Sequence, residues 1–227
     1  MDTVKSRRRY DSRGRQAQAR RNGNAILDVA EEKFLQAGYF STTVAEIATE
    51  SGVSVETIYK IFGGKSGLVR AIYERGLGGR GATAAYERSD EMRLYETDPE
   101  SLMRKWGALT AEVASEVTPI LLLVRTAAAT DEGMAALLLE SNKQRLERME
   151  HNARFMQSRG FLRDDVSLEE AIDVMWLNSS PELYELLVLQ RGWSLERFAR
   201  FVGDSLAGAL VRRTVGPDTG ASAADAF

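Results

Sequence analysis

Apolar residues between positions 44 and 62 recur at the spacing of two short helices. Val44, Ile47 and Ala48 lie on one face of the first helix. Gly52 interrupts the pattern, and glycine adopts the left-handed backbone of a tight turn without steric cost. Ser54 is a candidate N-cap for the second helix. The predicted inward face of that helix is Val55, Ile58, Ile61 and Phe62. This stretch predicts a helix-turn-helix; an ordinary helical hairpin in an all-α core is the alternative interpretation.

The other face of the second helix is polar and charged. It carries Glu56, Thr57, Tyr59 and Lys60. A helix of this kind can enter the major groove of DNA and direct side chains at bases and phosphates. The pattern therefore favours DNA binding.

Two more helices are predicted around this pair. One runs from about Asn24 to Gly38, with an apolar face made by Ile26, Val29, Ala30, Phe34 and Ala37. Thr43 directly precedes Val44 and is the best-placed N-cap, where a hydroxyl can also donate to a phosphate. After Phe62, two glycines predict a second turn and a helix that starts near Lys65. An ammonium beside free backbone amides suits a phosphate.

The rest of the chain is predicted to form long helices. Residues 134–159 are expected to turn Leu138, Leu139, Leu146, Met149 and Phe155 inward. The predicted ranges are 100–117, 119–130, 134–159, 168–190 and 195–213. With only four prolines in 227 residues, the fold class is all-α: an N-terminal three-helix DNA-binding domain and a larger C-terminal helical domain.

Composition narrows the function classes. The chain has no cysteine and a single histidine, His151. Disulfides and thiolate metal sites are excluded, and a histidine metal cluster or catalytic triad is disfavoured. We therefore expect no enzyme activity, no metal and no cofactor. His151 lies in a charged helix surface and is expected to be exposed.

Charge is unevenly distributed along the chain. Residues 1–80 hold 14 Lys and Arg against nine Asp and Glu, a net charge of +5, which leaves −8 on the remainder. A basic first third indicates that this part meets a polyanion. The alternative is a solvated basic tail that only raises solubility.

The expected domain layout follows these patterns. Residues 1–20 form a disordered, arginine-rich arm, 21–80 the DNA-binding domain, 81–215 a larger helical domain, and 216–227 a disordered tail. No signal peptide or membrane segment is expected, because the longest apolar run, residues 119–124, is too short to span a bilayer. The predicted location is the cytoplasm.

Residues 24–75 resemble the DNA-binding domain of the tetracycline-repressor-like (TetR) family of bacterial transcription regulators. The stretch TIYKIFGGKSGL matches the family pattern of two aromatics, a lysine and a leucine at Tyr59, Phe62, Lys65 and Leu68. The preceding AGYFSTTVAEIA, residues 37–48, matches the link between the first two helices.

This resemblance implies roles for individual residues. Thr43, Tyr59 and Lys65 would contact phosphates, and Ser54, Val55, Glu56, Thr57 and Lys60 would lie on or near the base-reading surface. Many relatives have an aromatic or histidine where this chain has Lys60 and Ile61, so the base preference stays open. Ile61 is interpreted as a packing residue.

The resemblance also implies a small-molecule effector and a homodimer. The candidate pocket residues are Met103, Trp106, Arg125, Met149, Phe155, Met175, Trp176 and Asn178, with Tyr184 as a further polar candidate. The last two predicted helices, Leu168 to Arg213, would form the dimer interface. Small Gly203, Ala207 and Gly208 would permit close approach. The alternative is that this face folds onto its own core.

The predicted function is a regulator of transcription, a repressor that a small molecule releases from a palindromic double-stranded DNA operator. A constitutive DNA-binding or nucleoid-associated protein of the same fold, or an activator, is the alternative. An enzyme built on the helical domain is a third hypothesis, with no nucleophile and base pair behind it.

Overall fold

The computed structural model describes residues 22–212, and these are helical apart from turns and one isolated antiparallel bridge, Leu162 to Val211. The predicted all-α class is confirmed. The arm predicted at 1–20 and the tail predicted at 216–227 lie outside the described residues. The first described helix covers residues 22–37. It is followed by α2 (Val44–Ser51), α3 (Val55–Phe62), α4 (Lys65–Leu77), α5 (Ala85–Tyr95), α6 (Pro99–Ala127), α7 (Glu132–Ser158), α8 (Leu168–Asn178), α9 (Pro181–Tyr184), the π-helix η1 (Glu185–Gln190) and α10 (Leu195–Leu210).

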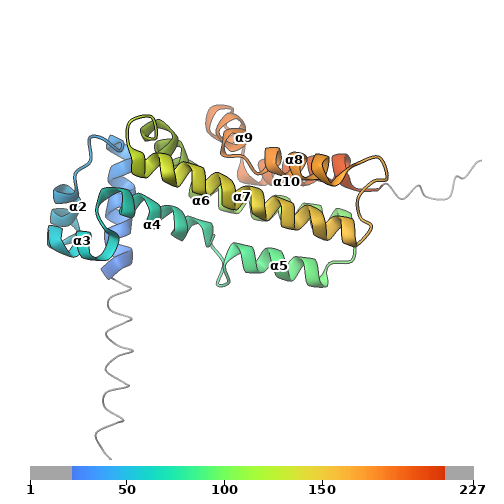
Figure 1. Ribbon diagram of the computed structural model, residues 1–227, viewed down its shortest axis with the longest axis horizontal. Helices are drawn as coiled ribbons and strands as arrows, with labels where there is room; N and C mark the ends of the chain where they lie inside the picture. Colours follow the sequence, from blue (N-terminus) through green and yellow to red (C-terminus); the bar gives the residue numbers. More distant parts are fainter. Residues whose placement is uncertain (1–21, 213–227) are drawn as a thin grey trace, which may run out of the picture.

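The first helix, α2, α3 and α4 pack together at one end of the molecule, and α5 to α10 form a larger helical body (Figure 1). The core shared by the first helix, α2, α3 and α4 contains Ile26, Phe34, Ile47, Ile58 and Leu68. The same core continues into the C-terminal half of α6 and the start of α7. The four helices that contain the candidate DNA-binding surface are therefore packed directly against the larger body.

The helix-turn-helix prediction is confirmed in its turns and caps. Thr43 caps α2, Ser54 caps α3, and Gly52 between them has the left-handed φ of 69°. The predicted inward face of α3 is only partly right. Ile58 is fully buried, but Val55 is 39% exposed and Ile61 52% exposed. The interpretation of Ile61 as a packing residue is wrong, because an eight-residue helix that crosses α2 buries only a narrow stripe.

The helix predicted at 100–117 and that predicted at 119–130 are one helix, α6, of 29 residues. Pro119 lies inside it. An internal proline lacks one backbone hydrogen-bond donor and usually ends a helix, which is why the sequence suggested two. Packing against α4, α7 and α10 keeps this helix continuous.

The opposite error occurs at the helix predicted for 168–190. It is divided into α8, α9 and η1, because Ser180 caps a new helix in which Pro181 occupies the first turn. In α7 the predicted inward residues Leu139 and Leu146 are wrong, since they are 74% and 43% exposed. The residues that α7 buries are Met134, Leu137, Ser141, Asn152, Ala153 and Met156.

α10 packs along α6, and its apolar face is buried within the same chain. A Cβ on Gly107 of α6 would lie 2.6 Å from the backbone nitrogen of Gly203 in α10. The small residue at 203 permits close contact with α6 of the same chain, whereas the sequence analysis assigned it to contact between subunits. Phe198, Val202, Leu206 and Leu210 also fill the protein's own core. These four side chains are therefore not available to a partner subunit, and a dimer interface on residues 168–213 stays a prediction for the exposed faces of these helices.

One helix in the described part of the chain, α6, is long enough to cross a bilayer and contains an 18-residue window with a mean hydropathy of 1.5. The sequence interpretation had divided this stretch at Pro119 and so found no such segment. A core helix of a soluble protein has the same character, and α6 packs against α4, α5, α7, α9 and α10. Helix length and hydropathy alone are therefore weak evidence that α6 spans a membrane.

Candidate nucleic-acid interface and effector cavity

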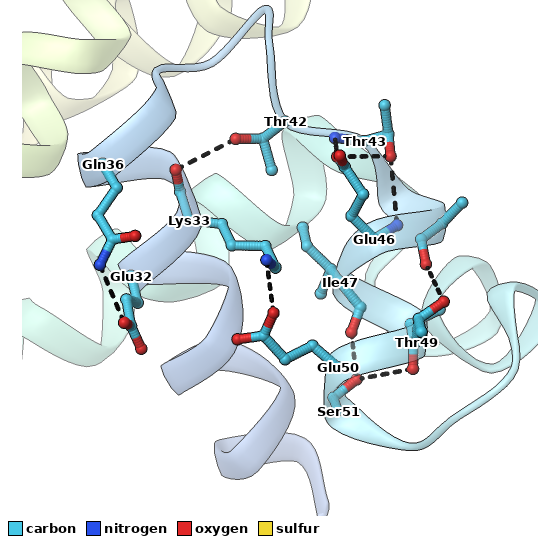
Figure 2. Close-up of polar contacts among 12 residues, drawn as sticks. Glu32, Lys33, Gln36, Thr42, Thr43, Glu46, Ile47, Thr49, Glu50 and Ser51 are labelled. Carbon is cyan, nitrogen blue, oxygen red and sulfur yellow. Dashed lines mark hydrogen bonds and ion pairs between the residues drawn. The ribbon is translucent and has the colours of Figure 1, made fainter.

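The start of α2 is closed by a reciprocal pair of hydrogen bonds between Thr43 and Glu46 (Figure 2). The backbone nitrogen of Glu46 donates to Thr43 Oγ1 over 3.2 Å, and the backbone nitrogen and hydroxyl of Thr43 both donate to Glu46 Oε2 over 2.8 Å. These hydrogen bonds from Thr43 lower the pKa of Glu46. The proposed phosphate-binding hydroxyl therefore already has a carboxylate partner, and Glu46 would have to turn away before Thr43 could donate to DNA.

Further polar contacts hold α2 against the first helix. Lys33 Nζ lies 2.5 Å from a carboxylate oxygen of Glu50, and the Thr42 hydroxyl donates to the carbonyl of Lys33 over 3.2 Å (Figure 2). The same hydroxyl lies 2.9 Å from the carbonyl oxygen of Gly38. Thr42 is buried. The position of α2 is thus fixed at both of its ends, as a helix that supports a reading helix requires.

α3 presents a mixed surface to solvent. Ser54 Oγ accepts from the backbone nitrogen of Thr57 over 3.2 Å and lies 3.0 Å from the Thr57 hydroxyl. Both residues therefore shape the start of the helix. The exposed side chains of α3 are Val55, Glu56, Tyr59, Lys60 and Ile61. This face combines apolar, acidic, basic and hydroxyl groups, which is the range needed to distinguish base edges.

Tyr59 and the turn after α3 are positioned by glycines. Gly64 has a φ of 113°, and a Cβ there would lie 3.0 Å from Cε1 of the Tyr59 ring. A Cβ on Gly67 would lie only 1.5 Å from the carbonyl oxygen of Phe62. The requirement at Gly67 was missed in the sequence, although a glycine in the first turn of a helix is itself a signal of close packing.

Lys65 does not extend freely into solvent. Its ammonium lies 4.3 Å from the centre of the Tyr39 ring and 3.5 Å from the carbonyl oxygen of Phe40. Partial burial lowers the pKa of Lys65, and the negative charges of Asp131 and Glu46 oppose this. The Tyr39 hydroxyl donates to Asp131 over 2.8 Å, and Asp131 caps α7. The proposed phosphate-binding lysine is therefore close to a contact that joins the two parts of the molecule.

A cavity of about 370 Å³ lies between α4, α5, α6, α7, α8, α9 and α10. Its size lies at the lower end of the range for small-molecule pockets, about 300–1,000 Å³. Of the eight candidate pocket residues, Trp106, Met149, Met175 and Asn178 line it. α4 also contributes Tyr73 and Leu77. The cavity is thus in direct contact with the helix that follows the helix-turn-helix.

The other four candidates do not line this cavity. Met103 is fully buried in the core, and Arg125 lies on the surface beside Glu182 and Glu185. Phe155 packs edge-to-face on Phe161. Trp176 lies beneath the guanidinium of Arg145. Tyr184 packs edge-to-face on Phe198. Amphipathic spacing shows that such residues face inward, but it does not distinguish core from cavity.

Three buried polar atoms on residues that line the cavity have no hydrogen-bond partner in the described structure. They are Trp106 Nε1, Thr118 Oγ1 and Asn152 Oδ1. Leaving such a group unsatisfied costs about 1–3 kcal/mol. Native proteins keep few of them, so three around one cavity indicate a site that a ligand or water completes.

The cavity also contains an arginine that the sequence analysis missed. Arg145 Nη1 donates to the carbonyl oxygen of Trp176 over 2.7 Å and to the Ser179 hydroxyl over 3.2 Å, and the guanidinium lies 3.3 Å above the Trp176 ring. Burial lowers its pKa to about 10. In the sequence it lies within a densely charged run and resembles a solvated residue. The usable signal is that Ser141, Arg145, Met149 and Asn152 share one helical face.

Comparison with known proteins agrees with this architecture. Residues 26–72 match the family model described as bacterial regulatory proteins, tetR family. An uncharacterized HTH-type transcriptional regulator of Bacillus subtilis, YvkB, is 37% identical over 65 residues, which cover 29% of this chain and 34% of that protein. The chain thus matches about a third of the length of this curated relative.

Solved structures extend the similarity of fold to the larger body. A TetR-family regulator from Syntrophomonas wolfei has a TM-score of 0.67 and 19% identity, covering 83% of this chain and 94% of that one. A transcriptional regulator from Saccharomonospora viridis, solved with choline, has a TM-score of 0.62 and 20% identity, covering 87% and 100%. Residues 26–72 thus combine the capped helix-turn-helix with a match to the TetR family model, and the larger helical body has the fold of solved TetR-family regulators.

Proposed function

We propose that this chain is a homodimeric DNA-binding repressor of transcription that a small-molecule effector releases from a pseudo-palindromic operator. The observation that carries the proposal is the position of α4. It starts at the turn after α3 and contributes Tyr73 and Leu77 to the cavity wall. A ligand that fills the cavity contacts the helix on which the reading helix depends. The S. viridis regulator, with a related fold, was solved with a small molecule.

Most of the proposed DNA contacts are exposed, and Thr57 and Lys65 are half-buried beside them. The residues are Thr43, Ser54, Val55, Glu56, Thr57, Tyr59, Lys60 and Lys65, and the exposure of Ile61 adds it to this set. Val55 and Ile61 offer apolar contact to thymine methyl groups, and Lys60 offers donors to guanine. Residues 21–80 would be the DNA-binding domain and 81–215 the effector and dimerisation domain.

The proposed dimer surface lies on the last helices but on a face different from the predicted one. Large apolar side chains there are exposed: Leu177 of α8, Leu186 and Leu189 of η1, and Phe201 of α10. Two subunits joined through this face would place their α3 helices in successive major grooves about 34 Å apart. Such a protein acts on the chromosome, so its proposed location is the cytoplasm.

Release requires that the effector bind the non-DNA conformation more tightly than the DNA-bound one. Binding at one site then weakens binding at the other, and a coupling of about 1–3 kcal/mol changes the affinity for the operator about 5- to 150-fold. Tyr39, Asp131 and Lys65 lie where α4 meets α7, and this contact is the proposed route of the coupling.

Binding of the purified protein to sheared genomic DNA of its source tests the DNA-binding half of the proposal. A few sharp palindromic sites are expected; broad binding that disappears at modest salt would contradict it. On the best site, Lys65→Ala should weaken binding to every sequence and reduce the salt slope by about one per subunit. Lys60→Ala should change which bases matter. Lys143→Ala, on the exposed surface of α7, is the matched control.

A further inference from the structure

We infer that the cavity takes a small organic acid, with a single carboxylate held between Arg145 of α7 and Tyr73 of α4 and an apolar body lying among the side chains of α6 and α8. The inference rests on the proposed function, because it names the ligand class of the proposed effector site.

The charge of the cavity wall selects an anion. Its lining residues include two arginines, Arg145 and Arg148, and no Asp or Glu from the described part of the chain. Arg148 donates to Asp90, which also pairs with Arg93. Arg145 has no carboxylate within 4.0 Å among the described residues. The charge of Glu182 raises the pKa of Arg145 from a longer distance, but burial outweighs it. A partly buried charge without a directly paired carboxylate is costly, and an anionic ligand would supply that partner.

Arg145 has donors to spare. A guanidinium holds five N–H groups, and only Nη1 donates within residues 22–212. The N–H groups of Nε and Nη2 can therefore form the paired contact that a carboxylate prefers. Stacking on Trp176 fixes the plane of the guanidinium, so this donor pair is pre-organised.

Tyr73 adds a neutral donor from a different helix. It lines the cavity, and burial raises its pKa to about 12, so its hydroxyl stays protonated at neutral pH. Arg145 and Tyr73 are close enough to affect each other's pKa. A carboxylate that accepts hydrogen bonds from both Tyr73 and Arg145 would link α4 to α7.

The remainder of the wall favours an apolar body. α6 contributes Leu109, Val113 and Leu121, and Met149 and Met175 face them from α7 and α8. Methionine adapts to irregular apolar shapes. With one charged donor group and a volume of about 370 Å³, a compact monocarboxylate fits better than a polyanion.

Isothermal titration of the DNA-free protein with octanoate, 1-octanol and octylamine tests this ligand class, because the three probes share one chain and differ in charge. Octanoate is expected to bind about tenfold or more tightly than the other two. Equal or tighter binding of the alcohol or the amine overturns the inference. Absence of octanoate binding at millimolar concentration also overturns it.

Variants locate the carboxylate. Arg145→Gln should weaken octanoate about tenfold or more and leave 1-octanol nearly unchanged, and Tyr73→Phe should weaken octanoate a few-fold. Arg125→Gln, which removes a surface arginine, should change neither. If Arg145→Gln weakens all three probes equally, Arg145 acts only on the shape of the cavity and the inference is wrong.

Operator release is measured separately, with the selected DNA site and saturating octanoate. Octanoate binding without any change in operator affinity would count against the proposed function and leave the ligand class standing. Operator release by a neutral or cationic compound that does not need Arg145 would support the function and overturn the ligand class.

Discussion

Gly67 is the residue that allows α4 to start close to the last residue of α3. Gly67→Ala would place a methyl group 1.5 Å from the Phe62 carbonyl oxygen, so α3 and α4 would have to separate. We expect a loss of about 1–3 kcal/mol or more in unfolding free energy, measured by urea denaturation, together with loss of DNA binding. The control is Gly23→Ala in the first helix, where no atom lies within 4 Å of the new methyl. That variant should be neutral or up to about 1 kcal/mol more stable.

The Tyr39–Asp131 contact predicts a specific dependence of stability on pH. Partial burial of Asp131 would raise its pKa, but donation from Met134, Tyr39 and Gly133 outweighs it, and the pKa is lowered. A carboxyl whose pKa is lower in the folded state stabilises the fold above its unfolded value, near pH 4, and this contribution is lost as pH falls through the folded value.

Asp131→Asn should therefore reduce stability at pH 7 and make the stability less sensitive to acid below about pH 5. Urea denaturation at pH 7 and pH 3 measures both effects. Asp173→Asn, on an exposed position of α8, is the control and should keep the wild-type pH profile. An unchanged profile in Asp131→Asn would show that the contact contributes little.

Local side-chain chemistry was predictable from the sequence, and long-range chemistry was not. The caps at Thr43 and Ser54 involve atoms within three residues, so the sequence itself places them. The role of Arg145 depends on Trp176 and Ser179, more than 30 residues away, and on a cavity walled by several helices. The helical face that Arg145 shares with Met149 and Asn152 indicates that it turns inward, but no local pattern indicates its contacts with Trp176 and Ser179.

At the scale of elements, α6 carries an internal proline that its neighbours tolerate. Because an interior proline costs about 3 kcal/mol relative to alanine, Pro119→Ala should stabilise the protein by about 1–3 kcal/mol. Thermal denaturation measures this. Pro181→Ala is the matched control: Pro181 occupies the first turn of α9, where its missing N–H is not needed, so no gain is expected.

A loss of stability in Pro119→Ala would show that the proline is required for the packing of α6. Thr118 and Leu121 beside it line the cavity. In that case the probes used for the cavity should also bind more weakly to the variant.

The existence of most helices was predicted, but α5 lies outside every predicted range, and the helix breaks were not predicted. The signals at residues 118–119 and 179–181 are similar, a hydroxyl residue before a proline. The first lies inside α6, where burial on several sides outweighs the lost hydrogen bond, whereas the second starts a new helix with Ser180 as its cap. Tertiary packing decides between the two outcomes.

For the whole molecule, the exposed apolar face of the last helices predicts the assembly. Leu186→Glu with Leu189→Glu should convert the proposed dimer to a monomer, because two charges would be buried in an apolar interface. Light scattering after size exclusion measures the mass, and circular dichroism checks that the helices remain. Leu139→Glu, at an exposed position of α7, should leave the mass unchanged. If the double variant remains a dimer, the interface lies on a different face of the molecule.

The positions of the tryptophans allow fluorescence to report ligand binding and subunit association separately. Trp106 presents an unpaired indole nitrogen at the cavity, and Trp176 lies under the cavity arginine. Trp193 packs on Phe201 beneath Arg197, at the face proposed for assembly. The chain has three tryptophans. Intrinsic fluorescence of variants that keep one tryptophan would therefore report ligand entry and subunit association as separate signals, without an added dye.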